Sequence, residues 1–328
     1  MKKSALAILT ALPFLALEPG IAQPVTPTET VKVQAAPMPD ATVTGFVKTF
    51  TAPSMLTGKI PRWAKNICLK TQGLPHELAD AVSKRILEVA RMVGAPVMEQ
   101  PCDLNTVVIF DSNPQGVMDD IAARHEELLG THDPAQLKDL AKVHFPIQAW
   151  YATETQDNNG TSIADSNNQS AECEAVPDNM LDGAAGALTG GLRVNTTRYS
   201  QVINDKQRFC GRRVVTGSRV RDGVLSRLAA VTVVASMDTV QYHELSAVAD
   251  YLALVILSQT KAFETCEKME TVANLLVPRC DLNNRVDGLM PGDIAFLKAL
   301  YKADAGGTLV AQQAAIAGEM KKILNAAR

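Results

Sequence analysis

The hydrophobic pattern of the first folded segment predicts a strand, a long helix and a second strand. Residues 66–70 form a short, mostly apolar run that is typical of a strand. Between residues 78 and 93 apolar side chains recur every three or four positions, and Gly94 follows them. This spacing places one apolar stripe along a helix and gives it a glycine stop signal. Residues 106–110 are apolar and rich in β-branched side chains, which predicts a buried strand.

Two helices, a strand and a tight turn are expected next. The helices cover residues 117–129 and 134–143, and the strand covers residues 149–155. Asn159-Gly160 follows within a polar run, and this dipeptide is typical of a hairpin turn. A loop-rich insertion is predicted over about residues 156–197, which are rich in Asn, Asp, Ala and Gly. Its glycines do not match a phosphate-binding loop, because no clear strand precedes them and no Gly-Lys-Ser/Thr follows.

The last third of the chain predicts one central strand and three helices. Residues 228–235 are apolar on both faces, as expected of a strand inside a sheet. Residues 243–257 follow as a helix that is apolar nearly all round, so we expect it to be buried. Helices over residues 291–301 and 309–324 complete the pattern. The fold class that these elements predict is α+β, a mixed sheet with packed helices.

The first residues of the chain form a pattern typical of a secretory signal peptide. Two lysines follow Met1, and residues 4–17 are an apolar run without charge. We expect residues 1–22 to be removed by cleavage between Ala22 and Gln23. The mature protein is then periplasmic or secreted. No cysteine lies near the cleavage site to carry a lipid anchor.

Two further regions are predicted behind the signal peptide. Residues 23–56 are rich in Pro and Thr and poor in aromatic side chains, so we expect a flexible, extended or loosely packed arm. Residues 57–328 are expected to form a single α+β domain. No second apolar run is long enough to span a bilayer, so the mature chain has no predicted transmembrane segment.

The six cysteines of the chain predict disulfide bonds, because an even number in an exported protein is usually paired. None of them shows the C-x-x-C spacing of a zinc ribbon or of a thioredoxin-like site. Sequence alone allows many pairings, and their distribution favours closure between neighbours. The expected pairs are Cys68-Cys102, Cys173-Cys210 and Cys266-Cys280.

Charge gives little indication of a partner. The formal net charge is −3, which does not suggest binding to nucleic acid or to an anionic membrane. A group of arginines alternates with valines, and it either binds an anionic polymer or forms the solvated face of a hairpin. These arginines are Arg208, Arg212, Arg213, Arg219 and Arg221.

The order of the predicted elements resembles that of zincin-type metallopeptidases, especially metzincins. Residues 293–301 read Asp-Ile-Ala-Phe-Leu-Lys-Ala-Leu-Tyr, similar to the D-I-x-x-L-x-x-L-Y segment that closes such domains. The region from Trp63 to Phe110 also resembles the opening of uncharacterised secreted bacterial proteins of this type. The resemblance covers residues 60–302 as topology. It implies that the buried helix at residues 243–257 occupies the place of the zinc-binding helix.

The zinc chemistry of that family does not carry over to this sequence. A zincin helix needs His at positions i and i+4, with Glu at i+1 as general base. His243-Glu244 lies at the matching helix, but Ala247 stands where the second histidine should be. Asp250 lies two turns after His243 and is the one candidate on the same helix that could replace it. In the simpler interpretation, Glu244 complements the positive end of the helix dipole.

Two acids remain as candidates for other hydrolytic chemistry. Asp238 ends a predicted buried strand and Asp250 lies within an apolar helix, so together they could serve as an acid pair. The competing interpretation is that Asp250 bonds a nearby arginine or a backbone amide. The chain has no G-x-S-x-G nucleophile motif, and the expected disulfides leave no free thiol.

The sequence therefore predicts a non-catalytic binding or structural role in the periplasm or cell envelope, as a degenerate zincin or pseudoenzyme. No cofactor is expected, and the partner is an unidentified envelope protein or polymer. The alternative is a divergent zinc metallopeptidase or another hydrolase acting outside the cytoplasm. The two differ in whether His and carboxylate groups converge on one cleft.

Overall fold

The computed structural model describes most of the chain after residue 38, and these residues belong to one compact unit. The described ranges are 39–99, 101–124, 129, 134–163, 223–261, 263–278, 280 and 286–326. The predicted signal peptide and cleavage site, most of the predicted loop-rich insertion, the arginine group and the Cys173-Cys210 pair lie outside them.

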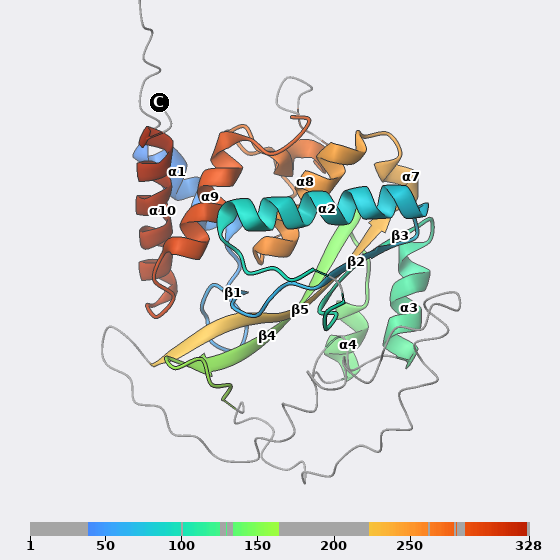
Figure 1. Cartoon of the computed structure of the whole chain (residues 1–328), viewed down its shortest axis with the longest axis horizontal. Coiled ribbons are helices and arrows are strands. Elements are labelled where there is room, and N and C mark those ends of the chain that lie inside the picture. Colours follow the sequence, from blue (N-terminus) through green and yellow to red (C-terminus); the bar gives the residue numbers. More distant parts are fainter. Residues whose placement is uncertain are drawn as a thin grey trace, which may run out of the picture. The chain divides into compact units, whose positions relative to one another are not determined.

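A mixed, largely parallel five-stranded sheet forms the centre of this unit (Figure 1). Its strands are β1 (Arg62–Trp63), β2 (Leu69–Gln72), β3 (Thr106–Asp111), β4 (Ile147–Asp157) and β5 (Val224–Ser236). One side of β5 pairs in parallel with β1 near its start and with β3 near its end, and β2 pairs in parallel with β3. The other side of β5 pairs with β4, which runs antiparallel.

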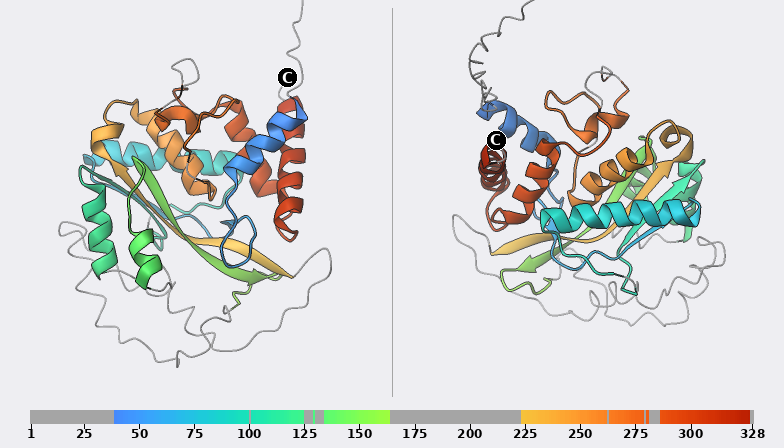
Figure 2. Two further views of the ribbon diagram at one scale, coloured as in Figure 1. Left: turned by 180° about the vertical axis from the view of Figure 1, so that it is seen from behind. Right: turned by 45° about the horizontal axis from the view of Figure 1, so that its top comes forward.

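Helices cover both faces of the sheet, because β5 is apolar at successive positions, whose side chains point to opposite faces (Figure 2). Val233 packs with α2 (His76–Val93) and α8 (Leu245–Leu257), in a core that also includes α9 (Pro291–Lys302) and α10 (Leu309–Ala326). Val234, its neighbour on β5, belongs to a second cluster with α3 (Pro114–Arg124) and α4 (Pro134–Leu140). Short α7 (Met237–Val240) links β5 to α8, and the 3-10 helix η4 (Val272–Leu276) packs on α8.

The strongest predicted elements are present. Helix α2 buries its apolar stripe and ends at Gly94, whose φ of 84° gives the left-handed cap that glycine favours. Strand β3 coincides with the predicted run, and β5 is longer than expected. The Asn159-Gly160 turn closes a hairpin, in which the backbone amide of Ile163 donates to the carbonyl of Thr155 over 2.8 Å. No described helix is both long and apolar enough to cross a membrane.

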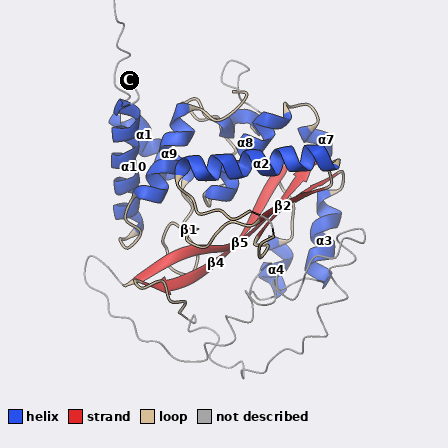
Figure 3. Ribbon diagram, viewed as in Figure 1, coloured by secondary structure: helices blue, strands red, loops and turns tan. Residues whose placement is uncertain are grey.

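The predicted flexible arm at residues 23–56 is wrong where the structure describes it. Asp40–Phe50 is a helix, α1, and it packs against α10 at the edge of the helical layer (Figures 2 and 3). Its residues Val43, Phe46, Val47 and Phe50 are buried at helical spacing. Phe50 meets Phe296 of α9 edge-on, with ring centroids 5.6 Å apart. The folded unit therefore begins before residue 57, and the prolines around α1 concealed its apolar stripe.

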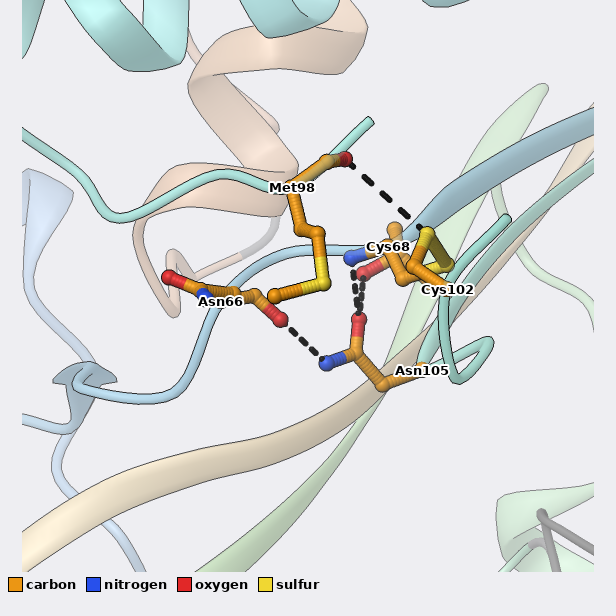
Figure 4. Close-up of a disulfide and its surroundings, with 6 residues drawn as sticks. Asn66, Cys68, Met98, Cys102 and Asn105 are labelled. Carbon is orange, nitrogen blue, oxygen red and sulfur yellow. Dashed lines mark hydrogen bonds between the residues drawn. A yellow bond between two sulfur atoms is a disulfide. The ribbon is translucent and has the colours of Figure 1, made fainter. Parts of the chain in front are cut away.

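Two of the three predicted disulfides are in the described residues. Cys68-Cys102 joins the chain before β2 to the chain before β3, and Cys266-Cys280 closes the segment between α8 and α9. Asn105 supports the first bridge: its Oδ1 accepts from the Cys68 amide at 2.9 Å and its Nδ2 donates to the Asn66 carbonyl at 2.8 Å (Figure 4). Paired cysteines are typical of proteins that fold outside the cytoplasm.

Candidate functional site

Helix α8 is the element that the sequence resemblance matches to a zinc-binding helix, and its first turn has no second ligand. His243 precedes the helix and is half-buried, while Glu244 is exposed at the N-cap position and makes no side-chain capping bond. Ala247, one turn further, is 1% exposed and packs in the core. Within the part of the chain that the structure describes, no three His, Cys, Asp or Glu side chains converge as metal ligands would.

Asp250 forms an ion pair with α2. Arg85 donates from Nε to Oδ1 at 2.6 Å and from Nη2 to Oδ2 at 3.0 Å, and the Leu289 amide also donates to Oδ2 at 3.0 Å. Gly288 fits closely here, since a Cβ at that position would lie 2.9 Å from Oδ2. The interpretation that Asp250 bonds an arginine or a backbone amide is confirmed, and both partners are present. Asp250 fixes α8 to α2 and to the chain entering α9.

The acid pair considered from the sequence finds no support in this arrangement. Asp238 is exposed on α7. Asp250 is 4% exposed, and both of its oxygens accept hydrogen bonds from protein groups. A general acid must be able to give its proton to a substrate, and both oxygens of Asp250 are already engaged by protein donors. The environments of Asp238 and Asp250 therefore do not match those of a catalytic carboxyl pair.

A second buried acid, Asp293, lies at the start of α9 and sequence analysis did not single it out. It is fully buried and accepts hydrogen bonds from the Thr271 hydroxyl and from the amides of Val272 and Met290. Its bond to the Met290 amide caps α9, as an acidic side chain in the first turn commonly does. Burial raises the pKa of Asp293 to about 6, because desolvation outweighs these bonds and the charge of Asp250 adds to it.

This raised pKa predicts a pH-dependent loss of stability. Asp293 is protonated in the folded protein and ionised in the unfolded chain between the usual value of 3.8 and about 6. Its contribution to the free energy of unfolding is therefore fully present below the pKa of the unfolded chain and is lost as the pH rises through about 6. In the native protein we expect the free energy of unfolding to fall by about 2 to 3 kcal/mol for this reason. The Asp293→Asn variant should not show this fall. Urea unfolding across this pH range measures it, and identical slopes for both proteins would contradict the assignment.

A cavity of about 190 Å³ lies between β4, α8 and the segment that follows α8. Among the described residues, the lining of this cavity is mainly aliphatic and aromatic and includes no His, Cys, Asp or Glu. Tyr251 of α8 meets Phe263 edge-on at 6.3 Å, and the Tyr151 hydroxyl of β4 donates to the Val255 carbonyl at 2.9 Å. Burial raises the pKa of both tyrosines, so they stay neutral. The lining residues are Phe145, Pro146, Ile147, Gln148, Ala149, Tyr151, Tyr251, Val255, Thr260, Lys261, Phe263, Leu276 and Val277.

Strand β4 also has an edge that no described strand covers over residues 147–153. Its pairing there is with β5 alone, and only the end of the strand pairs again, through the hairpin around Asn159-Gly160. An uncovered edge presents backbone donors and acceptors at the strand spacing. The cavity lies beside this edge, because Ile147, Ala149 and Tyr151 of β4 line it. Together the uncovered edge and the cavity form what we call the β4–α8 groove.

The sequence pattern does not predict this groove, because its residues come from distant parts of the chain. Tyr251, the one aromatic residue of the helix at residues 245–257, is the local signal that could have indicated it. Comparisons with protein-family models, with curated proteins and with solved structures found no match.

Proposed function

We propose that this chain is an exported, non-catalytic binding protein with a zincin-like arrangement that has lost its metal site. Its element order supports this proposal: β2, α2 and β3, then the antiparallel edge strand β4, and β5 leading into buried α8. The two disulfides support a location outside the cytoplasm. The observation that carries the proposal is the lining of the β4–α8 groove, which has aromatic and aliphatic side chains in place of ligands or acids.

The ligand class that this groove fits is an extended polypeptide with one large apolar side chain. The uncovered edge of β4 can bond the main chain of a segment added beside it, and the cavity can take one of its side chains. A dry cavity of about 150 Å³ holds a benzene molecule, so 190 Å³ is enough for one aromatic ring. Exposed Lys261 at the cavity offers a positive charge to an acidic neighbour on the peptide.

Fluorescence titration with a matched set of labelled hexapeptides tests this function. The peptides differ at one position, which is Phe, Leu, Ala or Asp, and we expect binding for Phe and Leu and at least a roughly tenfold loss for Ala. N-methylation of every second amide should abolish binding for one of the two alternating sets and leave it intact for the other, since only every second amide of an added strand faces β4. A peptide that binds equally well with every amide methylated would contradict strand addition.

Two variants locate the binding in the protein. Ala149→Phe fills the cavity from β4 and should remove binding while leaving the fold intact. Val310→Phe is the matched control, since Val310 is 74% exposed on α10 and gains the same ring at a distant surface. Cleavage of the peptides, or equal binding by the Ala149→Phe variant and the native protein, would overturn the proposal.

A further inference from the structure

A second pocket, of about 650 Å³, lies near the start of β1 and β5 and holds two arginines. Arg62 of β1 and Arg227 of β5 are register partners, so their side chains project from the same face of the sheet. Two like charges directly opposite each other on paired strands destabilise the sheet. This pair therefore needs a compensating anion. Arg62, Trp63, Ala64, Gly94, Pro96, Asn158, Leu225, Arg227, Tyr301, Ala303, Asp304 and Ala305 line the pocket.

Arg62 has donors that are buried without a hydrogen-bond partner. Its side chain bonds the Ala303 carbonyl through Nη1, while Nε and Nη2 have no partner among the described residues. Arg62 is only 4% exposed, and Nε of Arg227 is also buried without a partner. Burial and the charge of Arg227 lower the pKa of Arg62 to about 10, which still leaves it charged at neutral pH.

The unpartnered nitrogens of Arg62, Nε and Nη2, are the same two through which Arg85 binds a carboxylate. Arg85 holds Asp250 through Nε and Nη2, which point in parallel and match two oxygens of one anion. In Arg62 the same two nitrogens have no hydrogen-bond partner among the described residues, and the residue lines the pocket. A group with two or more oxygens, placed against Arg62 and touching Nε of Arg227, would satisfy all three donors.

Two acids act on this pair through their charge, Glu154 on Arg227 and Asp304 on Arg62, but no described residue bonds the three unpartnered nitrogens. Glu154 is the register partner of Arg227 on β4, but its oxygens accept bonds from Lys65, Gln156 and Ser162. Asp304 lines the pocket and accepts the Gly306 amide at 3.0 Å. Lys59, which is 2% exposed, lies nearby, and its Nζ donates to the Gly306 carbonyl of the turn that Arg62 also bonds. Of the described residues that line the pocket, two are cations, Arg62 and Arg227, and one is an acid, Asp304.

We propose that this pocket binds a phosphate group, free or carried by a small ligand, between Arg62 and Arg227. A phosphate has oxygens directed to several sides, so two of them can accept from Arg62 while another accepts from Arg227. A carboxylate would satisfy Arg62 alone. The site is separate from the β4–α8 groove and does not depend on the function proposed for it.

Thermal unfolding of the full mature protein tests the site with inorganic phosphate as the probe. In a chloride buffer free of other oxyanions, phosphate up to about 10 mM should raise Tm by several degrees with a saturable dependence, because it binds the folded protein only. Acetate at equal ionic strength should give a much smaller rise. A rise that grows linearly with phosphate, or that acetate reproduces in full, would overturn the proposal.

Arg227→Gln is the decisive variant. Without phosphate it should have a higher Tm than the native protein, since it removes the like charge opposite Arg62, and phosphate should no longer raise it. Arg62→Lys should weaken phosphate binding at least roughly tenfold, because an ammonium cannot replace the two parallel donors. Arg91→Gln, at an exposed arginine of α2, should keep the full rise, as should Ala149→Phe. An unchanged rise in Arg227→Gln would refute the site.

Discussion

Replacing Arg85 by Met should lower the free energy of unfolding by about 2 to 4 kcal/mol, less than the cost of breaking a fully buried ion pair because the Arg85 side chain is 36% exposed. Asp250 is 4% exposed, and without Arg85 it would keep the Leu289 amide as its one remaining hydrogen-bond donor in the described contacts. A carboxylate left charged in such surroundings is costly, and protonating it also costs free energy at neutral pH. Urea unfolding at pH 7 measures the difference.

A matched control and a double variant separate this effect from general damage to α2. Arg91→Met removes an exposed pair with Glu99 on the same helix and should cost less than about 1 kcal/mol. Asp250→Leu combined with Arg85→Met should recover much of the loss, because it removes the unpaired charge. Equal small effects for both arginines would mean that the Asp250 ion pair does not fix α8 to α2.

Removing the Cys68-Cys102 bridge by changing both cysteines to alanine should cost about 4 kcal/mol, from the chain entropy of a loop of 34 residues. The loop contains α2, which supplies the apolar stripe under the sheet. The expected result is a large drop in Tm for the variant, and at least as large a drop in native protein after reduction, which also opens Cys266-Cys280. Reduction without a change in Tm would show that the bridge does not stabilise the fold.

The sequence predicted those elements whose stability is local. Helix α2 has a complete apolar stripe and a glycine cap, and β3 is a continuous apolar run bounded by polar residues. Both signals lie within a single window of the chain, so periodicity and capping rules can detect them. The Asn159-Gly160 turn belongs to the same class.

The elements that the sequence concealed depend on contacts between distant residues. Strand β1 has two residues and exists because β5 pairs with it, so it has no pattern of its own. Helix α1 follows prolines and is held by aromatic packing against α9, more than 240 residues later. Tertiary burial rather than local propensity stabilises such elements.

The candidate sites also depend on contacts between residues that are distant in the sequence. The question about Asp250 could be posed from the sequence, since an acid in an apolar helix needs a partner, but Arg85 is 165 residues away. Arg62 and Arg227 carry no motif, and only the register of β1 against β5 makes them neighbours. A motif search finds ligands at fixed spacing along one element, and neither pocket of this protein is built that way.

We expect α8 to hold no catalytic metal and the groove beside it to bind without cleaving. Zinc content of the purified mature protein, measured after equilibration with zinc and dialysis, is the sharpest test. We expect far less than one zinc per chain, and the same value for a His243→Ala variant, because Ala247 offers no ligand and Asp250 is bound to Arg85. About one zinc per chain in the native protein, lost in His243→Ala, would contradict it and favour a divergent metallopeptidase.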